Sequence, residues 1–347
     1  MKATVFFHGI KTVSPAQAIC RKERMNMNPR KAGIIGCGHV GASIAFSLMQ
    51  RAIFSELVLL DVCREKAEGE AMDLSHGLPY TAAMDIYAGG YDDLKDAALV
   101  IITAGAGQKP EETRLELIGR NVVILRSILE RLRPTGFQGI LLMVSNPVDV
   151  LTWAAQRLSG YPINRVIGSG TVLDTGRLKY LLGQRLAVDS RSVHAFLIGE
   201  HGDSEVAVWS GANVSGIDLP HFFALRGVQN PSPVMGQIDC DVRESAYEII
   251  RKKGATYYGI AMAVARIAEC IVKDERAVLP VSTVLTGQYG MRDIALSVPS
   301  IVGKSGVESV LEIALDSEEH RALAESARQL TEAMKKIEDQ LTPVCAG

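Results

Sequence analysis

The chain has 347 residues, of which 47% are apolar and 22% charged, proportions typical of a folded globular protein rather than a disordered or fibrous one. Its 37 basic and 39 acidic residues give a formal net charge of −2, so no cationic excess indicates binding to nucleic acid or to an anionic membrane. No apolar run reaches the roughly 18 residues that a transmembrane helix needs.

The N-terminal 30 residues differ from the rest of the chain. They carry many basic side chains and one acid, Glu23, and their apolar stretch is too short for a signal peptide. We expect residues 1–30 to be an arm without fixed structure or a start assigned too early, with a transit peptide as the alternative. The six cysteines are scattered without a CxxC pair, which predicts free thiols in a reducing cytoplasm, no disulfide framework and no metal site.

From residue 31 onward, apolar strands and a helical pattern alternate. Strands that are apolar at almost every position are expected at residues 32–35, 57–60, 99–102 and 140–144. Such strands are buried on both faces, as in a parallel sheet that helices cover. The amphipathic stretch 114–133 fits a right-handed crossover between the last two strands. The sequence therefore predicts an α/β fold, with a Rossmann-type doubly wound parallel sheet over residues 31–165.

The rhythm changes after residue 146, and we assign residues 166–347 to a mixed α+β substrate domain. Residues 166–168 are expected to form the last strand of the first sheet. The elements expected beyond it are strands at 193–198 and 205–209, a helix at 245–272 broken near Gly254, an antiparallel pair at 277–286 and 294–302, and an amphipathic helix at 318–341.

A glycine motif, Gly36-Cys37-Gly38-His39-Val40-Gly41, lies between the first strand and the first helix. In a dinucleotide fingerprint the first glycine permits the turn, the second admits the pyrophosphate, and the third lets the helix pack on the strand. Asp61 ends the next strand, where an acid accepts ribose hydrogen bonds and repels a 2′-phosphate. We therefore predict NAD as cofactor. The alternative is a plain glycine turn with a surface aspartate, and a redox role for Cys37 is the alternative to its being a small filler.

His201 lies in a polar, glycine-flanked turn, Ile198-Gly199-Glu200-His201-Gly202-Asp203-Ser204, which favours presenting its imidazole to a ligand. Asp174 and Arg177 are three residues apart and share a face of the expected helix. Asp174 is suited to orienting the imidazole, and Arg177 to binding an anion. A surface ion pair between these two residues is the alternative interpretation.

Two further segments belong to the predicted site. Residues 145–149 end a strand at the sheet edge where ligands bind in open α/β sheets. Residues 103–114 leave another strand with two glycines and polar side chains, which is typical of a mobile lid.

In order and spacing, motifs 36–41, 108–114, 145–149, 173–177 and 199–204 resemble the L-lactate/malate dehydrogenase family. The resemblance covers about residues 31–341 and is strongest to the bacterial NAD-dependent L-lactate dehydrogenases. It implies that His201 donates and accepts the proton, that Asp174 orients it, and that Arg114 polarises the substrate carbonyl. The substrate-binding residues it implies are Gln108, Arg114, Asn146, Arg177 and Thr256. The cofactor-binding residues it implies are Gly36, Gly38, Val40, Gly41, Asp61, Asn146 and Ile260.

The activity implied is reversible hydride transfer between NADH and pyruvate, giving (S)-lactate. Gln108 occupies the lid position that selects the substrate, and it is neutral. Burying the second carboxylate of oxaloacetate there without a counter-charge costs several kcal/mol. A malate or other 2-hydroxy acid dehydrogenase stays open as an alternative because Lys109 is adjacent. A non-catalytic nucleotide-binding protein is the alternative from another class, and Glu111 departs from the glycine common in this lid.

The resemblance also implies a homotetramer and a cytoplasmic location. Lys179 and His194 match positions that bind the phosphates of fructose 1,6-bisphosphate in relatives activated by that ligand. The usual arginine is a lysine here, so the charge remains but two-pronged binding is lost. The alternative is a solvated lysine and a histidine packed at an interface.

Overall fold

The computed structural model describes residues 27–107 and 114–341. Within these residues the main sheet has nine strands in the order β14-β13-β12-β6-β5-β4-β1-β2-β3. They are β1 (Asn28–Ile35), β2 (Glu56–Leu60), β3 (Asp85–Ala88), β4 (Ala97–Ile102), β5 (Ile140–Met143), β6 (Val166–Gly168), β12 (Ala277–Thr286), β13 (Arg292–Gly303) and β14 (Gly306–Val310). Strands β1 to β6 pair in parallel, and β12 to β14 extend the sheet in antiparallel pairing.

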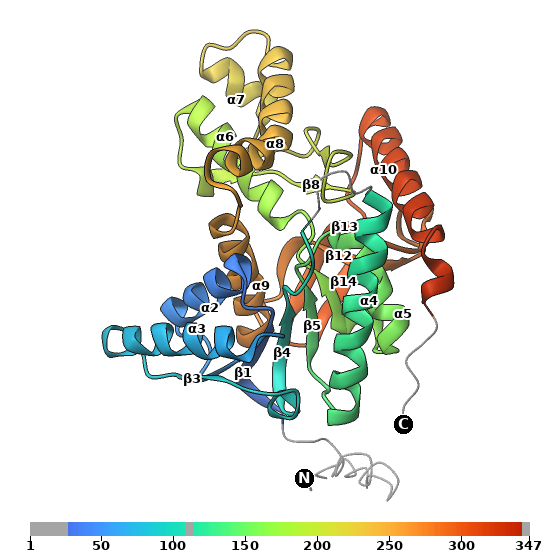
Figure 1. Ribbon diagram of the computed structural model, residues 1–347. Helices are drawn as coiled ribbons and strands as arrows, with labels where there is room; N and C mark the ends of the chain where they lie inside the picture. The colour runs from blue at the N-terminus through green and yellow to red at the C-terminus, as the bar shows by residue number, and fades with distance from the viewer. Residues whose placement is uncertain (1–26, 108–113, 342–347) are drawn as a thin grey trace, which may run out of the picture.

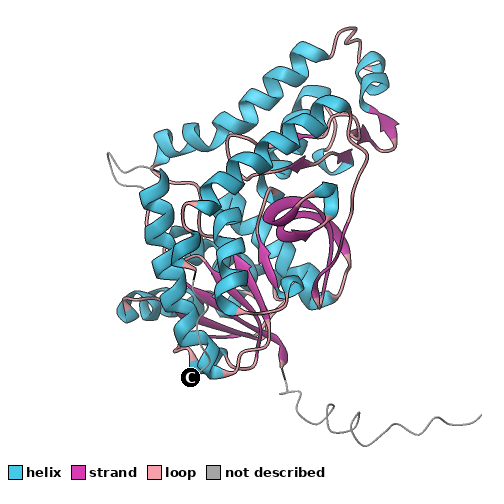
Figure 2. Ribbon diagram, turned by 90° about the vertical axis from the view of Figure 1, so that its right-hand side faces the viewer, coloured by secondary structure: helices cyan, strands magenta, loops and turns pink. Residues whose placement is uncertain are grey.

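Helices cover both faces of this sheet. One layer consists of α2 (His39–Arg51), α3 (Arg64–Gly77) and α9 (Tyr258–Lys273), and the other of α4 (Arg114–Leu132), α5 (Val148–Ser159) and α10 (Ser317–Lys335) (Figure 1). In β4, Leu99 and Ile101 pack into the apolar core under α2, α3 and α9, whereas Val100 and Ile102 pack into the core under α4, α5 and α10. Burial on both faces is the reason that the strands are apolar at successive positions. Figure 2 shows the strands enclosed by these helices.

A third apolar core stabilises the part of the substrate half that lies beyond the sheet. Leu178, Leu182, Val193 and Phe223 are among its buried residues. The elements around it are α6 (Val172–Leu186), β7 (Val193–His194), β8 (Leu197–Ile198), β9 (Val206–Ala207), β10 (Asn213–Val214), β11 (Ile217–Asp218), α7 (Leu219–Leu225) and α8 (Ser232–Lys253). Figure 1 places α6, α7 and α8 together at one end of the molecule.

The predicted α/β class and the Rossmann-type sheet are confirmed, but β6 does not end the sheet. Gly168 of β6 pairs with Ser282 of β12, so strands from the second half continue the first sheet. The short-range pattern of residues 166–168 contains no sign of this partner, because it lies more than a hundred residues along the chain. The division at residues 165 and 166 remains a prediction.

Several expected bounds were wrong. The single strand expected at 193–198 is two, because β7 pairs with β10 whereas β8 pairs with β9. The strand expected at 205–209 has only the two residues of β9, and β3 was not predicted because it is a four-residue edge strand. The helix break at Gly254 is confirmed, with a φ of 84°, although α8 begins earlier than expected.

The two ends of the described chain also differ from expectation. β1 begins at Asn28, inside the segment expected to be an arm, and Lys31 is buried within it because Glu56 and Asp96 bind its ammonium group at 2.8 and 3.0 Å. The C-terminal helix α10 ends at Lys335 rather than at residue 341. Residues 1–26 lie outside the described residues. Among residues 27–107 and 114–341, none of the helices combines the length and apolar character required to cross a bilayer.

Candidate active site

The glycine motif forms the turn between β1 and α2 that the spacing predicts. Gly36 has a φ of 106°, and a Cβ on it would lie 2.6 Å from the Ala104 nitrogen. A Cβ on Gly41 would lie 1.9 Å from the Gly36 carbonyl oxygen, so this position requires glycine for close packing. A Cβ on Gly38 meets no atom of the described residues beyond its chain neighbours within 4 Å, which indicates open space beside the turn. Within residues 27–107 and 114–341, no side chain caps the N-terminus of α2, which leaves its first N–H groups available to a phosphate.

Asp61 connects the glycine turn to the end of β2. One carboxylate oxygen accepts a hydrogen bond from the Cys37 backbone N–H at 2.7 Å, and the other accepts one from the Cys63 N–H at 3.0 Å. Each carboxylate oxygen has a second lone pair for a ribose hydroxyl. Cys37 itself is buried, and burial raises the pKa of its thiol to about 12. A thiol held protonated in this way is a poor redox sensor, so the interpretation of Cys37 as a small filler is favoured.

The carboxyl ends of β1, β4 and β5 are joined by side-chain hydrogen bonds. The Thr103 hydroxyl donates to the Gly36 carbonyl at 2.6 Å, and the Ser145 hydroxyl donates to the Ala104 carbonyl at 2.6 Å. Asn121 of α4 donates to the backbone carbonyl of Asn146 at 2.8 Å, and the Asn146 side chain is exposed. This edge therefore brings the glycine turn and Asn146 to the same end of the sheet, as expected for a ligand site.

The predicted pair of His201 and Asp174 is present in the structure. Nδ1 of His201 lies 2.6 Å from a carboxylate oxygen of Asp174, whose side chain is only 2% exposed. Burial alone disfavours a charged imidazole, but the Asp174 charge and hydrogen bond outweigh it and raise the pKa of His201 to about 9. Because 21% of the His201 side chain stays exposed, its Nε2 can reach a ligand. At neutral pH His201 is thus a positioned proton donor.

The backbone around His201 is held by residues from distant elements. The His201 N–H donates to a carboxylate oxygen of Asp149 at 2.7 Å, and Ser297 of β13 donates its hydroxyl to the other oxygen at 3.0 Å. Gly199 and Ser297 also exchange two backbone hydrogen bonds, at 2.8 and 3.0 Å. Asp149 lies within the predicted motif 145–149 but had no predicted role. The sequence feature that could have indicated a role is the position of this acid in the first turn of the helix that follows a strand end.

Arg177 lies beside this pair on α6. Its Nη1 donates to the second Asp174 oxygen at 2.9 Å, so Asp174 binds both His201 and Arg177. The Arg177 side chain is 14% exposed, and no other acidic side chain in the described parts of the chain pairs with it. An arginine that is mostly buried and only partly neutralised is suited to binding a carboxylate. The ion pair that was the alternative exists, but it is buried beside His201 rather than on the surface.

A third ionisable residue near His201 was not predicted. Glu205 directly precedes β9 and is 8% exposed. Its carboxylate offers an oxygen within 4.8 Å of ligand atoms of both Asp174 and His201. Both oxygens of Asp174 already accept hydrogen bonds, so this cluster is better suited to sharing protons than to holding a metal ion. No periodic pattern pointed to Glu205, because an acid before a short strand is usually exposed.

The remaining predicted residues lie on other helices and strands or outside the described residues. Thr256 and Ile260 are half-buried at the α8–α9 junction, and Val40 is half-buried on α2. Gln108 falls outside the described residues, and Arg114 begins α4 with a side chain that is not described. Lys179 is half-buried on α6, and burial lowers its pKa, whereas His194 is exposed on β7, which packs against α6.

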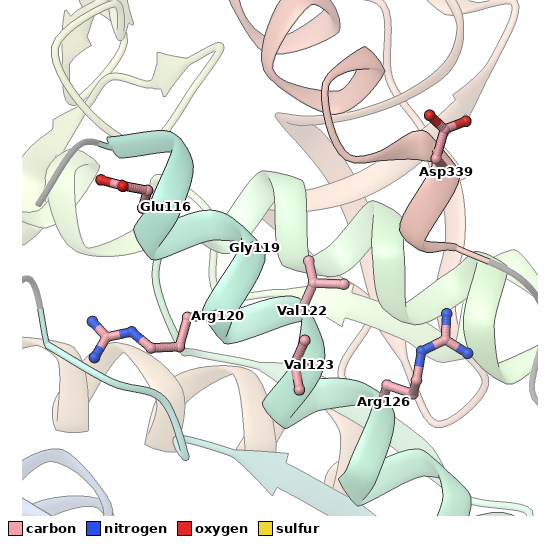
Figure 3. Close-up of a pocket in the computed structure, with 7 residues that line it drawn as sticks. All are labelled: Glu116, Gly119, Arg120, Val122, Val123, Arg126 and Asp339. Carbon is pink, nitrogen blue, oxygen red and sulfur yellow. The ribbon is translucent and has the colours of Figure 1, made fainter.

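A pocket on the outer side of α4 is separate from this site. Figure 3 shows its lining side chains along α4, with Asp339 on the neighbouring C-terminal segment. The pocket is lined by Glu116, Gly119, Arg120, Val122, Val123, Arg126 and Asp339. Among the predicted cofactor- and substrate-binding residues whose side chains the structure describes, none lines this pocket.

Comparison with known proteins agrees with this geometry. Residues 30–168 match the family model of the lactate/malate dehydrogenase NAD binding domain, and residues 171–341 match that of the lactate/malate dehydrogenase alpha/beta C-terminal domain. An L-lactate dehydrogenase of Priestia megaterium is 48% identical over 88% of this chain and 96% of its own length. L-lactate dehydrogenase 1 of Clostridium acetobutylicum is 47% identical over 88% and 98%.

Solved structures give the same result. The ligand-bound minor L-lactate dehydrogenase of Enterococcus mundtii superposes with a TM-score of 0.86 at 42% identity, covering 89% of this chain and 98% of that one. A lactate dehydrogenase from a deep-sea metagenome of the Medee basin superposes with a TM-score of 0.87 at 43% identity, covering 90% and 100%.

Proposed function

The chain belongs to the lactate/malate dehydrogenase family, and we propose that His201, Asp174 and Arg177 carry the reaction of an L-lactate dehydrogenase. The enzyme transfers a hydride reversibly between NADH and pyruvate, giving (S)-lactate and NAD⁺. The observation that supports these roles is the shared Asp174 carboxylate, which binds His201 at 2.6 Å and Arg177 at 2.9 Å. One buried acid thereby fixes the proton donor relative to the carboxylate-binding group.

The proton moves through His201. In pyruvate reduction, negative charge builds on the carbonyl oxygen, and the protonated imidazole donates from Nε2 while Nδ1 stays bound to Asp174. The raised pKa of His201, about 9, keeps it protonated at neutral pH. In lactate oxidation the neutral imidazole accepts the hydroxyl proton. Asn146, exposed at the end of β5, donates a hydrogen bond to the same oxygen.

NAD fits the open side of the glycine turn. The space beside Gly38 admits the pyrophosphate, which the free N–H groups of α2 bind. Asp61 accepts the ribose hydroxyls, and Val40 and Ile260 contribute apolar contacts. When bound, NADH supplies the hydride. Asp61 also disfavours the 2′-phosphate of NADP through charge repulsion.

Substrate choice depends on the lid and on the α8–α9 junction. By the family resemblance, Gln108 is assigned to substrate selection because it carries no charge, Thr256 to the substrate pocket, and Arg114 to polarising the carbonyl when the lid closes. Closure excludes water and strengthens the field of Arg114 on the developing oxyanion. A dicarboxylate such as oxaloacetate lacks a second cation in this arrangement.

The test is an NADH oxidation assay with pyruvate and oxaloacetate side by side. We expect kcat/KM for pyruvate to exceed that for oxaloacetate by roughly a hundredfold, because a buried unpaired carboxylate costs several kcal/mol. A preference for oxaloacetate would make the protein a malate dehydrogenase, and preference for a longer 2-oxo acid would assign it to that substrate. Tight NADH binding without turnover of any 2-oxo acid would identify a non-catalytic nucleotide-binding protein.

The proposal also covers the oligomeric state of the enzyme and its activation by a phosphorylated sugar. The enzyme is a cytoplasmic homotetramer with a role in fermentation, and its domains divide at residue 165. Lys179 and His194 bind the phosphates of fructose 1,6-bisphosphate across a subunit interface. Burial lowers the pKa of Lys179, so an anion that restores its charge is favoured there. The bisphosphate relieves repulsion between cations of neighbouring subunits and shifts the population toward the active form.

A further inference from the structure

The mechanism leaves one buried carboxylate beside the catalytic pair without a task. Glu205 is 8% exposed, and one of its oxygens lies within 4.8 Å of atoms of His201 and Asp174. Among the described residues, no side chain or backbone N–H donates a hydrogen bond to this carboxylate within ordinary distance. Burying a charge without a direct partner is costly, so the local charges decide when Glu205 ionises.

Charged groups from three elements face Glu205. Asp174 and Arg177 face it from α6, Arg243 faces it from α8, and His201 faces it from its own loop. Burial raises the pKa of Glu205 to about 8, and repulsion by Asp174 adds to this effect, whereas the three cations oppose it. Glu205 therefore changes charge in the same pH range as His201.

Two more acids lie against the cations that surround Glu205. Asp149 of α5 lies against His201, and its charge also raises the pKa of the imidazole. Asp239 of α8 faces Arg243. Asp149 and Asp174 bind His201 directly, so they cannot be altered without moving the imidazole. Glu205 is different, because it acts on His201 through space and not through a hydrogen bond.

We propose that Glu205 is a positioning residue that acts through His201: its ionised carboxylate holds the proton on the imidazole and extends pyruvate reduction to more alkaline pH. The inference rests on the proposed role of His201. As the pH rises, Glu205 loses its proton first, and the new negative charge increases the affinity of the nearby imidazole for its own proton. At the separation between Glu205 and His201, and with an effective dielectric constant of about 20–40 between them, one unit charge shifts the pKa of the imidazole by about one unit or more.

The experiment compares the pH dependence of kcat/KM for pyruvate, at saturating NADH, in the wild type and in Glu205→Gln. Glutamine keeps the size of the side chain and removes its charge. We expect the alkaline limb of the variant to move to lower pH by about one unit. With saturating NAD⁺, the acidic limb of lactate oxidation should move in the same direction, because both limbs report the same imidazole. Glu205→Asp keeps the charge, so its limbs should lie closer to those of the wild type.

Glu200→Gln is the matched control. Glu200 is a buried acid of the same loop, 3% exposed, and accepts a hydrogen bond from the Ser204 hydroxyl at 2.5 Å. Its charge is not among the main influences on His201. This variant should lower the melting temperature without moving either limb. If Glu205 only supported the fold, Glu205→Gln would behave in the same way, and the proposal would be wrong.

A measurement without substrate separates this inference from the proposed function. The pKa of His201 is followed by NMR of the imidazole in the wild type and in Glu205→Gln, with the signal assigned by its loss in His201→Gln. A fall of about one unit in the variant supports the coupling. An unchanged pKa in a folded Glu205→Gln protein overturns it, even if pyruvate reduction is confirmed. Full turnover in His201→Gln would refute the proposed function instead, while leaving the measured coupling intact.

Discussion

The glycine turn and the His201 loop are the two parts of the proposed site, and residues at very different distances along the chain hold them in place. The turn consists of six consecutive residues, and its main outside partner, Asp61, is 24 residues from Cys37. The His201 loop is held by Asp174 of α6, Asp149 of α5 and Ser297 of β13. Asp149 is 52 residues from His201 and 148 from Ser297.

We call the glycine turn with Asp61 the cofactor half of the proposed site, and the His201 loop with its hydrogen-bond partners the catalytic half. The two halves depend on the sequence in different ways. The cofactor half depends on backbone conformation and close packing, which a short motif can specify by itself. The catalytic half depends on a buried network in which one acid serves several partners, so a change at one member is transmitted to the others. Substitutions in the two halves should therefore separate cofactor binding from proton transfer.

The largest effect is expected at the centre of the catalytic half. His201→Gln removes the proton donor, so kcat should fall by about 100-fold or more, while NADH binding measured by fluorescence stays near the wild-type value. Asp174→Asn should cost less, because it disturbs the orientation and charge of an imidazole that is still present. Near-normal turnover in His201→Gln would show that the two halves are not divided in this way.

The lid should decide the substrate independently of both halves. Gln108→Arg places a cation opposite the substrate side chain, so the ratio of kcat/KM for oxaloacetate to that for pyruvate should rise by roughly a hundredfold, or about 3 kcal/mol. Gln108→Asn supplies a neutral control. An unchanged ratio in the arginine variant would contradict the assignment of Gln108.

Asp149→Ala tests the long-range clamp, by which we mean the hydrogen bonds from the His201 N–H and the Ser297 hydroxyl to Asp149. The variant leaves the His201 N–H and the Ser297 hydroxyl without their buried acceptor, which should lower the free energy of unfolding by about 2–4 kcal/mol. We expect kcat to fall about tenfold through misplacement of His201. The Kd of NADH should stay constant, and a matching loss of NADH affinity would mean that the clamp serves both halves.

Two glycines sharpen the comparison within the cofactor half. Gly41→Ala forces a Cβ against the Gly36 carbonyl, so it should destabilise the protein by about 1–3 kcal/mol as well as weaken NADH binding. Gly38→Ala meets no protein atom within 4 Å, so its melting temperature should stay near that of the wild type. The added methyl group should still raise the Kd of NADH by roughly tenfold, because it occupies space proposed for the pyrophosphate. Equal NADH affinity in Gly38→Ala and wild type would place the cofactor elsewhere.

The smallest effect is expected at the outer end of α6. Fructose 1,6-bisphosphate should lower the pyruvate concentration at half saturation by a few-fold in the wild type, consistent with typical allosteric coupling of about 1 kcal/mol. The double variant Lys179→Ala/His194→Ala should lose this response and keep its kcat. If the ligand has no effect on the wild type, or the same effect on the double variant, the site is not where we place it.

The sequence alone determined the features that depend on neighbouring residues. The glycine turn follows from residues 36–41, because a tight turn and close helix packing need glycine at fixed positions. The two-sided burial of β4 follows from its unbroken apolar run, and the helix break at Gly254 follows from the residue itself. The shared helical face of Asp174 and Arg177 follows from their spacing of three.

Only the tertiary structure decided which distant groups meet. The continuation of the sheet from β6 to β12 depends on strand pairing that no local pattern encodes. The same holds for Asp149 at the His201 N–H, and for Glu205 within 4.8 Å of His201 and Asp174. An acid in a sequence has one residue identity, but its pKa depends on the burial and charges that folding places around it. For that reason His201 and its partner Asp174 could be proposed from the sequence, whereas only the fold showed that Asp149 and Glu205 lie beside them.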